Sequence, residues 1–197
     1  FMAQEVAATW QEYVDYQDIR VLEIGMDLAY FDHLKRLAEN LEHPLLESLI
    51  ILTIDCYNII TVERALSLKK PGSFMKQLLS DAGTLSAREV IQCVEQGNLI
   101  SWFQQVNPLP YDVELTRYEE QMRAGRVSAE TVEYLEHVIK YRILEQASFE
   151  TDGPLPLARY LFGKELEVKN LRLVLTGLDN QLPIDKIKER MRPIYGQ

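Results

Sequence analysis

The sequence predicts an all-α fold, a helical bundle built from two related repeats. Apolar residues recur at spacings near three, four and seven along most of the chain. No alternation of apolar and polar residues survives five positions between turn signals, so no strand is expected. A residue pattern near position 55 returns near position 167. We therefore expect one repeat over 1–106 and a second over 107–197, divided at "NPLPYD".

The first half is expected to begin with a helix over 3–40, with Gly25 as the candidate interruption. Pro44 opens a second helix that runs to about Leu68, because a leading proline lacks only an N–H that would have no partner there. "KKPGS" is a turn, a short helix covers about 74–81, and "DAGT" is a loop. At 85–90, Ser86 and Glu89 have the spacing of a capping box.

The second half is expected to hold a helix over about 111–124 and another from 127 to about 148, with Ser128 as its N-cap. "TDGPLP" is a linker, and it is followed by a long helix over about 157–176. A loop at 177–182 then leads to a last helix that begins at Pro183.

A carboxylate, Glu167, falls on the apolar face of the long helix when residue 171 is placed at the centre of a helical wheel. The same face carries Leu157, Leu161, Val168, Val174, Leu175 and Leu178. Asn170 lies at its border. We therefore expect this helix to be buried along that face, with the acid in the interior.

A shift of 112 residues places Asp55 where Glu167 stood and Asn58 where Asn170 stood. The stripe on this earlier helix is Leu45, Leu49, Leu52, Ile59, Val62 and Leu66. Each copy is followed by a similar helix start, "LSAREV" or "LPIDKI", which aligns the segment at 85–90 with the segment at 182–187 after a longer insert in the first copy.

A buried carboxylate costs several kcal/mol unless it is paired or hydrogen-bonded. The open N–H groups of a following helix or loop would supply those bonds, and an Asn can bond loop backbone in the same way. We interpret Asp55, Asn58, Glu167 and Asn170 as structural residues that tie each long helix to its successor. A carboxylate pair for acid–base chemistry, or simple exposure of both acids, are the alternatives.

The net charge of −9 argues against nucleic acid as a partner and against direct adsorption on anionic lipid, while a basic protein partner stays open. The acids within 15–34 are interpreted as a solvated helix face. The most apolar run, "LIILTI", is far shorter than the roughly 20 residues that span a bilayer. No signal peptide is recognised, and the Phe before Met2 suggests a fragment or a remnant.

The sequence offers no candidate catalytic, cofactor-binding or metal-binding residue. The three histidines lack helical i, i+4 pairing, and "LFGKEL" holds only a lone Gly-Lys. Cys56 and Cys93 are interpreted as reduced thiols within helices, and nothing near Cys93 would lower its pKa. We expect a binding or mechanical component without a cofactor rather than an enzyme.

The segment at 160–191, "YLFGKELEVKNLRLVLTGLDNQLPIDKIKERM", resembles the terminal signature of the C/d subunit family of V-type and archaeal A-type ATPases. The shared residues are Tyr160, Leu161, Lys164, Glu165, Glu167, Val168, Asn170, Leu171 and Arg172, followed by a loop and a Pro-started helix. "EIGMDLAYFDHL" and "DCYNIITVERAL" resemble the preceding repeat, although Arg64 is out of register with Arg172.

The resemblance implies a protein of three helical repeats around a pseudo-threefold axis, of which this chain covers roughly the last two. It adds Arg172 to the structural residues. It implies a non-catalytic rotor adaptor, cytoplasmic and peripheral to the membrane, that couples central-stalk subunits to the membrane proteolipid ring and transmits torque for proton or sodium transport. It further implies a monomer within a hetero-complex. The alternatives are an unrelated helical adaptor or regulatory module, and an enzyme whose site the sequence does not reveal.

Overall fold

The fold is all-helical, as expected. The computed structural model describes residues 3–109, 112–125 and 127–194, and within them it contains ten helices and no strand. The helices are α1 (Ala3–Tyr16), α2 (Ile19–Leu41), α3 (Pro44–Ser67), α4 (Gly72–Leu78), α5 (Ala87–Glu95), α6 (Ile100–Val106), α7 (Val113–Arg123), α8 (Ala129–Glu145), α9 (Leu155–Asp179) and α10 (Ile184–Glu189).

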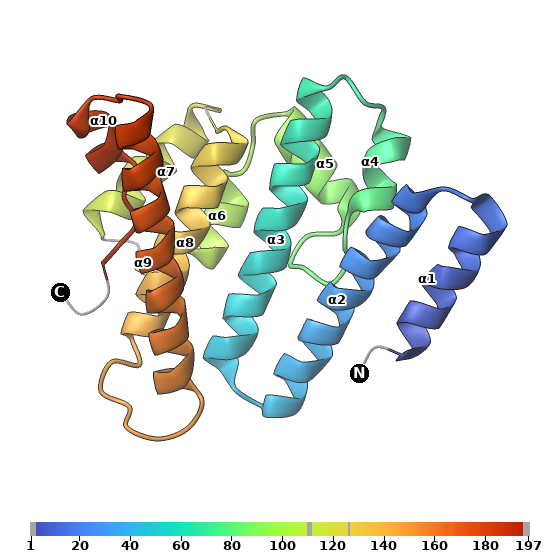
Figure 1. The fold of residues 1–197 in the computed structure, drawn as a ribbon, viewed down its shortest axis with the longest axis horizontal. Helices are drawn as coiled ribbons and strands as arrows, with labels where there is room; N and C mark the ends of the chain where they lie inside the picture. The colour runs from blue at the N-terminus through green and yellow to red at the C-terminus, as the bar shows by residue number, and fades with distance from the viewer. Residues whose placement is uncertain (1–2, 110–111, 126, 195–197) are drawn as a thin grey trace.

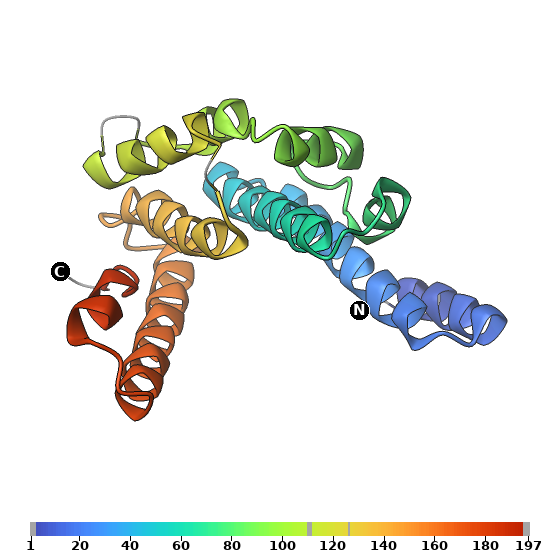
Figure 2. The ribbon, with the colours of Figure 1, turned by 90° about the horizontal axis from the view of Figure 1, so that it is seen from above.

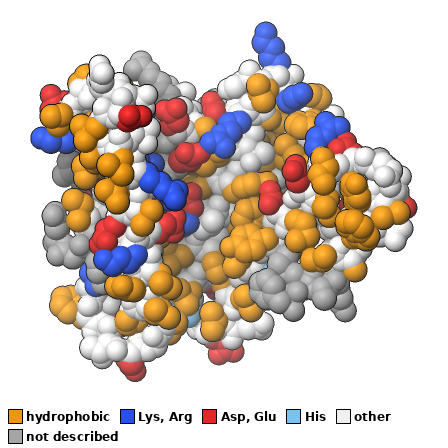
Figure 3. Space-filling view, in the orientation of Figure 1, with side chains coloured by type: hydrophobic (Ala, Val, Ile, Leu, Met, Phe, Trp, Pro, Cys, Tyr) orange, Lys and Arg blue, Asp and Glu red, His pale blue; other side chains and the backbone are white. Residues whose placement is uncertain are grey.

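The helices run from α1 and α2 at one end to α9 and α10 at the other, with α3 and α8 packed side by side between them (Figure 1). Seen from above, α5, α6 and α7 form a second layer over one side of α3 and α8 (Figure 2). On the opposite side, α9 and the α1–α2 pair project outward. The face between them is hollowed (Figure 3).

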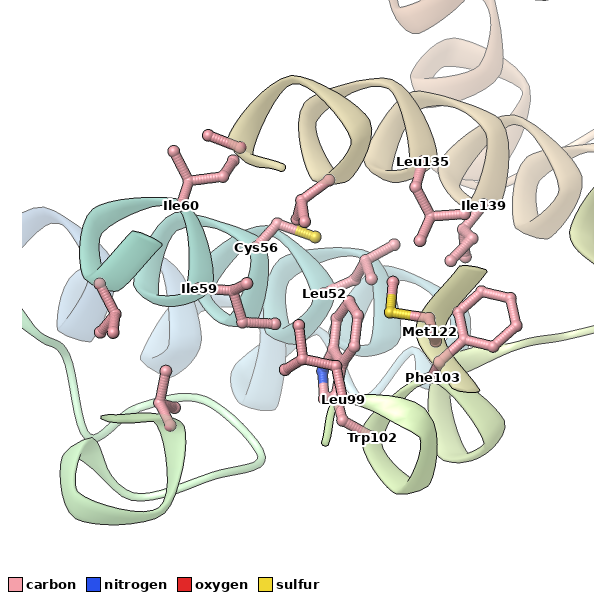
Figure 4. Packing of buried hydrophobic residues seen from close by; sticks show 14 of the residues in the cluster. Leu52, Cys56, Ile59, Ile60, Leu99, Trp102, Phe103, Met122, Leu135 and Ile139 are labelled. Carbon is pink, nitrogen blue, oxygen red and sulfur yellow. The ribbon is translucent and has the colours of Figure 1, made fainter. Parts of the chain in front are cut away.

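One continuous core joins both predicted halves. Leu52 and Ile59 of α3 belong to one cluster with Leu135 and Ile139 of α8 and Trp102 of α6. Leu52 lies toward the two α8 residues, whereas Ile59 lies on the side of α3 away from α8 (Figure 4). All five side chains are at most 2% exposed. The expected division at 106/107 therefore does not separate two independent cores, and the assignment of 1–106 and 107–197 as repeats stays a prediction.

The first helix breaks earlier than expected. Gln17 adopts a left-handed φ of 53°, and the Asp18 side chain caps α2 by accepting from the Arg20 N–H at 3.0 Å. Gly25 continues α2 without interruption. Its absent side chain has another reason, since a Cβ there would lie 2.5 Å from a Thr9 methyl carbon, where α1 packs on α2.

Several helix starts follow the sequence signals. Ser86 and Glu89 form both bonds of a capping box, and Ser128 accepts from the Thr131 N–H at 3.2 Å to cap α8. The short helix α4 begins and ends two to three residues before its expected range. The expected start of α7 at 111 lies outside the described residues. The sequence-based prediction missed α6, which Gly97, with φ 64°, separates from α5.

The helix α3 is long and apolar enough to cross a membrane by length and composition, with a mean hydropathy of 1.7 in its most apolar window. It nevertheless lies against α2, α5 and α8 and carries the buried polar residues Asp55 and Asn58. Its apolarity is accounted for by its place at the centre of the core.

Candidate functional site

Asp55 lies in the interior of the fold, 1% exposed, because α3 is covered by neighbouring elements on several sides. Its Oδ1 accepts from the Thr84 main-chain N–H at 2.7 Å, and its Oδ2 accepts from Trp102 Nε1 at 2.9 Å. One carboxylate thus bonds both the loop after α4 and the helix α6.

Asn58, one turn further along α3, bonds the main chain of Ser80 in both directions. Its Nδ2 donates to the Ser80 carbonyl at 2.8 Å, and its Oδ1 accepts from the Ser80 N–H at 3.0 Å. The Asn58 side chain is fully buried. We refer to this arrangement as the Asn58–Ser80 pair.

Asn170 on α9 forms the same arrangement with Arg192, here called the Asn170–Arg192 pair. The two bonds measure 3.0 and 2.8 Å, and both pairs join residues 22 positions apart. The shift of 112 residues therefore relates not only the two asparagines but also their main-chain partners.

The sequence analysis paired the helix start at 85–90 with the helix start at 182–187, but the structure favours a different pairing of the helices that follow α3 and α9. A shift of 112 relates α4 to α10 without any insert, since they begin at Gly72 and Ile184. The sequence-based prediction instead aligned the segment at 85–90, which begins α5, with the segment at 182–187. The similar residues at those two helix starts account for the different alignment.

Glu167 does not lie in the interior, and the wheel-based expectation is wrong on this point. Its Oε2 lies 2.7 Å from Lys164 Nζ on the same helix, and its side chain is 41% exposed. Among the residues that the structure describes, it bonds none of a following element. Arg172 is also exposed, and its guanidinium borders a depression between α8 and α9.

The reason for this error is that α9 buries a different side. Its buried positions are Leu155, Gly163, Leu166, Asn170 and Gly177. The predicted stripe is instead on the surface, with Leu157, Leu161, Val168, Leu171, Leu175 and Leu178 each between 49% and 60% exposed. Figure 3 shows these orange side chains as a band over α9.

The sequence predicted main-chain groups of a following loop as partners, and Asp55, Asn58 and Asn170 bond such groups, but it did not identify the individual residues. Trp102 carries the clearest signal that was overlooked, since a core tryptophan needs an acceptor for its N–H. Ser80, Thr84 and Arg192 contribute main-chain atoms, so their side chains give no such signal.

Neither cysteine has the surroundings of a nucleophile. Burial raises the pKa of the Cys56 thiol, and desolvation raises that of Cys93, so both stay protonated near neutrality. Among the residues the structure describes, no three His, Cys, Asp or Glu side chains gather in a way that could hold a metal ion.

Comparison with known proteins gives a consistent result. A sequence model of the ATP synthase (C/AC39) subunit family matches residues 2–190. The C subunit of the V-type sodium ATPase of Enterococcus hirae is 31% identical over 176 residues, which cover 88% of this chain and 52% of that protein. The C subunit of the A-type ATP synthase of Pyrococcus horikoshii is 25% identical over 175 residues, or 87% of this chain and 47% of that protein.

The chain thus spans about half the length of both relatives. No solved structure matches it well enough to serve as a relative.

Proposed function

The chain belongs to the ATP synthase (C/AC39) subunit family, and on that premise we propose that it forms part of a non-catalytic rotor adaptor in a V-type or A-type ATPase. The adaptor would join the central stalk to the membrane proteolipid ring on the cytoplasmic side and transmit torque between them. Family membership removes the alternative of an unrelated helical adaptor.

The observation that carries the proposal is the continuous core between α3 and α8. A part that transmits force must not bend between the surfaces that receive and deliver it. Here the two predicted repeats share one apolar cluster, and polar bonds from Asp55 and Asn58 fix α3 to the loop after α4. Close-packed interiors of this kind have low compressibility and transmit strain.

The mechanism requires no chemistry from this chain. Each helix acts as a strut whose side-chain contacts with its neighbours are already made before load is applied. The ion carried by the complex, proton or sodium, is set by groups that bind it within the membrane. The adaptor determines only whether rotation in one part reaches the other.

The test uses the full-length protein that contains these residues, assembled with the other subunits in vesicles. Ile139→Ala, in the α3–α8 core, should leave ATP hydrolysis in place while fewer ions are transported per ATP. Leu68→Ser is the matched control, because Leu68 is 70% exposed at the end of α3. Full ion transport by a complex that lacks the adaptor altogether would overturn the proposal.

A further inference from the structure

A depression of about 520 Å³ lies where α8 meets α9 and the segment after α10. Its lining is dominated by ionisable groups: Glu133, Glu136, His137, Lys169, Arg172 and Arg192, with Leu173 and Thr176. In the space-filling view, basic and acidic side chains gather beside α9 on the hollowed face (Figure 3). In a chain with a net charge of −9, several cations around one depression are unexpected.

The two acids in the lining already have cationic partners. Glu133 pairs with Arg64 of α3, and Glu136 pairs with Lys140 one turn along α8. Lys169 is similarly held by the Glu165 carboxylate at 2.6 Å. The remaining cations are Arg172 and Arg192, and in the described part of the chain no carboxylate lies within ion-pair distance of either guanidinium.

His137 contributes a buried donor without an acceptor. Its ring is 8% exposed, and its Nε2 lies 2.6 Å from Lys169 Nζ. A lysine ammonium can only donate, so Nε2 accepts and the ring proton is on Nδ1. Within the described residues Nδ1 has no hydrogen-bond partner, and neither does the buried Nε of Arg192. Buried donors of this kind cost about 1–3 kcal/mol each and ordinarily have a partner.

The local potential is positive. After burial, the charges of Lys169, Arg192 and Lys140 are the main causes that lower the pKa of His137, to about 3. The same potential would attract an anion to the depression.

These cations are not needed to hold the fold together. A comparison with the first half of the chain supports this conclusion. Under the shift of 112 residues, Lys169, Arg172 and Arg192 correspond to Tyr57, Ile60 and Ser80. The backbone there is held in the same way, by the Asn58–Ser80 pair in one half and the Asn170–Arg192 pair in the other. The same main-chain arrangement thus has three uncharged residues at these positions in the first copy and three cations in the second.

We propose that this depression binds a phosphate group, through the guanidinium groups of Arg172 and Arg192 and the Nδ1–H of His137. The donors come from α8, α9 and the segment after α10, so they approach from several directions. That arrangement suits a tetrahedral oxyanion with many acceptors better than a planar carboxylate. The Asn170–Arg192 pair fixes the main chain from which Arg192 reaches the site. This inference is independent of the partners proposed above.

The experiment titrates the purified chain with inorganic phosphate at constant ionic strength, followed by calorimetry and by the NMR signals of the His137 ring. We expect saturable binding in the millimolar range, with a shift of the Nδ1–H signal on binding. Arg172→Gln should weaken binding about tenfold, as expected for loss of one charge-assisted contact. Arg172→Lys should retain part of it, since the charge stays but the fork is lost.

Arg88→Gln on α5 is the matched control, because it removes the same charge from an exposed position elsewhere. Equal weakening by Arg88→Gln and Arg172→Gln would overturn the proposal, as would the absence of saturation in the millimolar range.

Two further probes identify the source of the phosphate. Tighter binding of glycerol 3-phosphate than of inorganic phosphate would point to a soluble ester. Binding to vesicles of phosphatidic acid that is tighter still, and lost with Arg172→Gln, would point to a lipid headgroup. Equal affinity for inorganic phosphate and the ester would identify the free ion.

Discussion

At the scale of single residues, the Asn58–Ser80 and Asn170–Arg192 pairs have the same geometry but differ in burial. We propose that each stabilises the junction between a long helix and the segment that follows it. Asn58→Ala should cost about 2–4 kcal/mol, because the N–H and the carbonyl of Ser80 both lose their buried partner. Asn170→Ala should cost less, since Asn170 is 8% exposed and water can replace part of the loss.

Urea unfolding followed by circular dichroism measures both changes. Asn40→Ala, on the exposed side of α2, is the control and should be neutral or slightly stabilising. If Asn58→Ala is as stable as this control, the structural role is wrong.

The two acids of the repeat should behave differently, although the sequence pattern treats them alike. Glu167→Ala should change the free energy of unfolding by less than about 1 kcal/mol, because Glu167 makes an exposed pair within one helix. Asp55→Ala should cost about 2–4 kcal/mol, because the Trp102 and Thr84 N–H groups lose their acceptor. Comparable losses in the two melting temperatures would contradict this assignment.

The histidine at position 137 makes stability depend on pH in a defined direction. Its pKa is lowered from 6.5 to about 3 in the folded chain, so the unfolded chain binds the proton first as the pH falls. Stability is therefore complete above about pH 6.5 and is lost as the pH falls from there toward 3.

Melting temperatures at about pH 7 and about pH 5 measure this effect in a range where carboxylates contribute little. The decrease between the two should be clearly smaller in His137→Gln. An equal decrease in both proteins would show that the ring is protonated in the folded state.

At the scale of the helix, α9 differs from its sequence-based prediction in the side that it buries. The long helix was predicted over about 157–176, and it runs from Leu155 to Asp179, so its first residues and part of the expected loop at 177–182 also belong to it. The inward position of Asn170 could be predicted, but the side that α9 buries could not. Leucines occur all round this helix, so a wheel centred on Leu171 finds an apolar stripe whichever side the neighbours cover. In α3 the expected stripe is largely buried, because α5 and α8 lie against it. Tertiary context, which the pattern does not contain, separates the two cases.

The two sides of α9 should therefore respond differently to truncation. Leu166→Ala, at a fully buried position, should cost about 2–5 kcal/mol. Leu171→Ala, at a position 59% exposed, should stay within about 0.5 kcal/mol of the unaltered chain. Denaturant unfolding of both variants distinguishes this structure from the arrangement that the wheel predicted, which would reverse the order.

At the scale of the whole molecule, the two repeats are expected to unfold together. The core around Leu52, Trp102 and Leu135 belongs to both, and no second cluster of similar size lies within one half in the described part of the chain. A cooperative domain loses such a core in one step.

Helical circular dichroism and the fluorescence of Trp102 should therefore give one coincident transition. Trp10→Phe removes the signal of the other tryptophan, which is 55% exposed. Two separate transitions would indicate that the halves have independent stability, as a boundary at 106/107 taken literally would suggest.

The pattern that predicts a repeat was visible in the sequence because Asp55, Asn58 and their counterparts are polar residues in apolar helices. The packing of α3 against α8 was not visible in the sequence, since Leu135 and Ile139 look like any other core residues of a helix. A polar residue in an apolar helix indicates that a hydrogen-bond partner lies nearby. An apolar residue indicates only that it is buried, and it does not indicate which element covers it.

One contact between the halves contains no side chain at all. The turn between α5 and α6 touches the turn between α7 and α8 at Gly97 and Gly125, which both have φ near 64°, and a Cβ on Gly97 would lie 3.3 Å from the Gly125 Cα. An alanine at either position would be strained in its own backbone, and an alanine at position 97 would also crowd the neighbouring turn. We therefore expect both glycines to be conserved. An alignment of orthologous sequences should show both of them retained while the residues on either side vary.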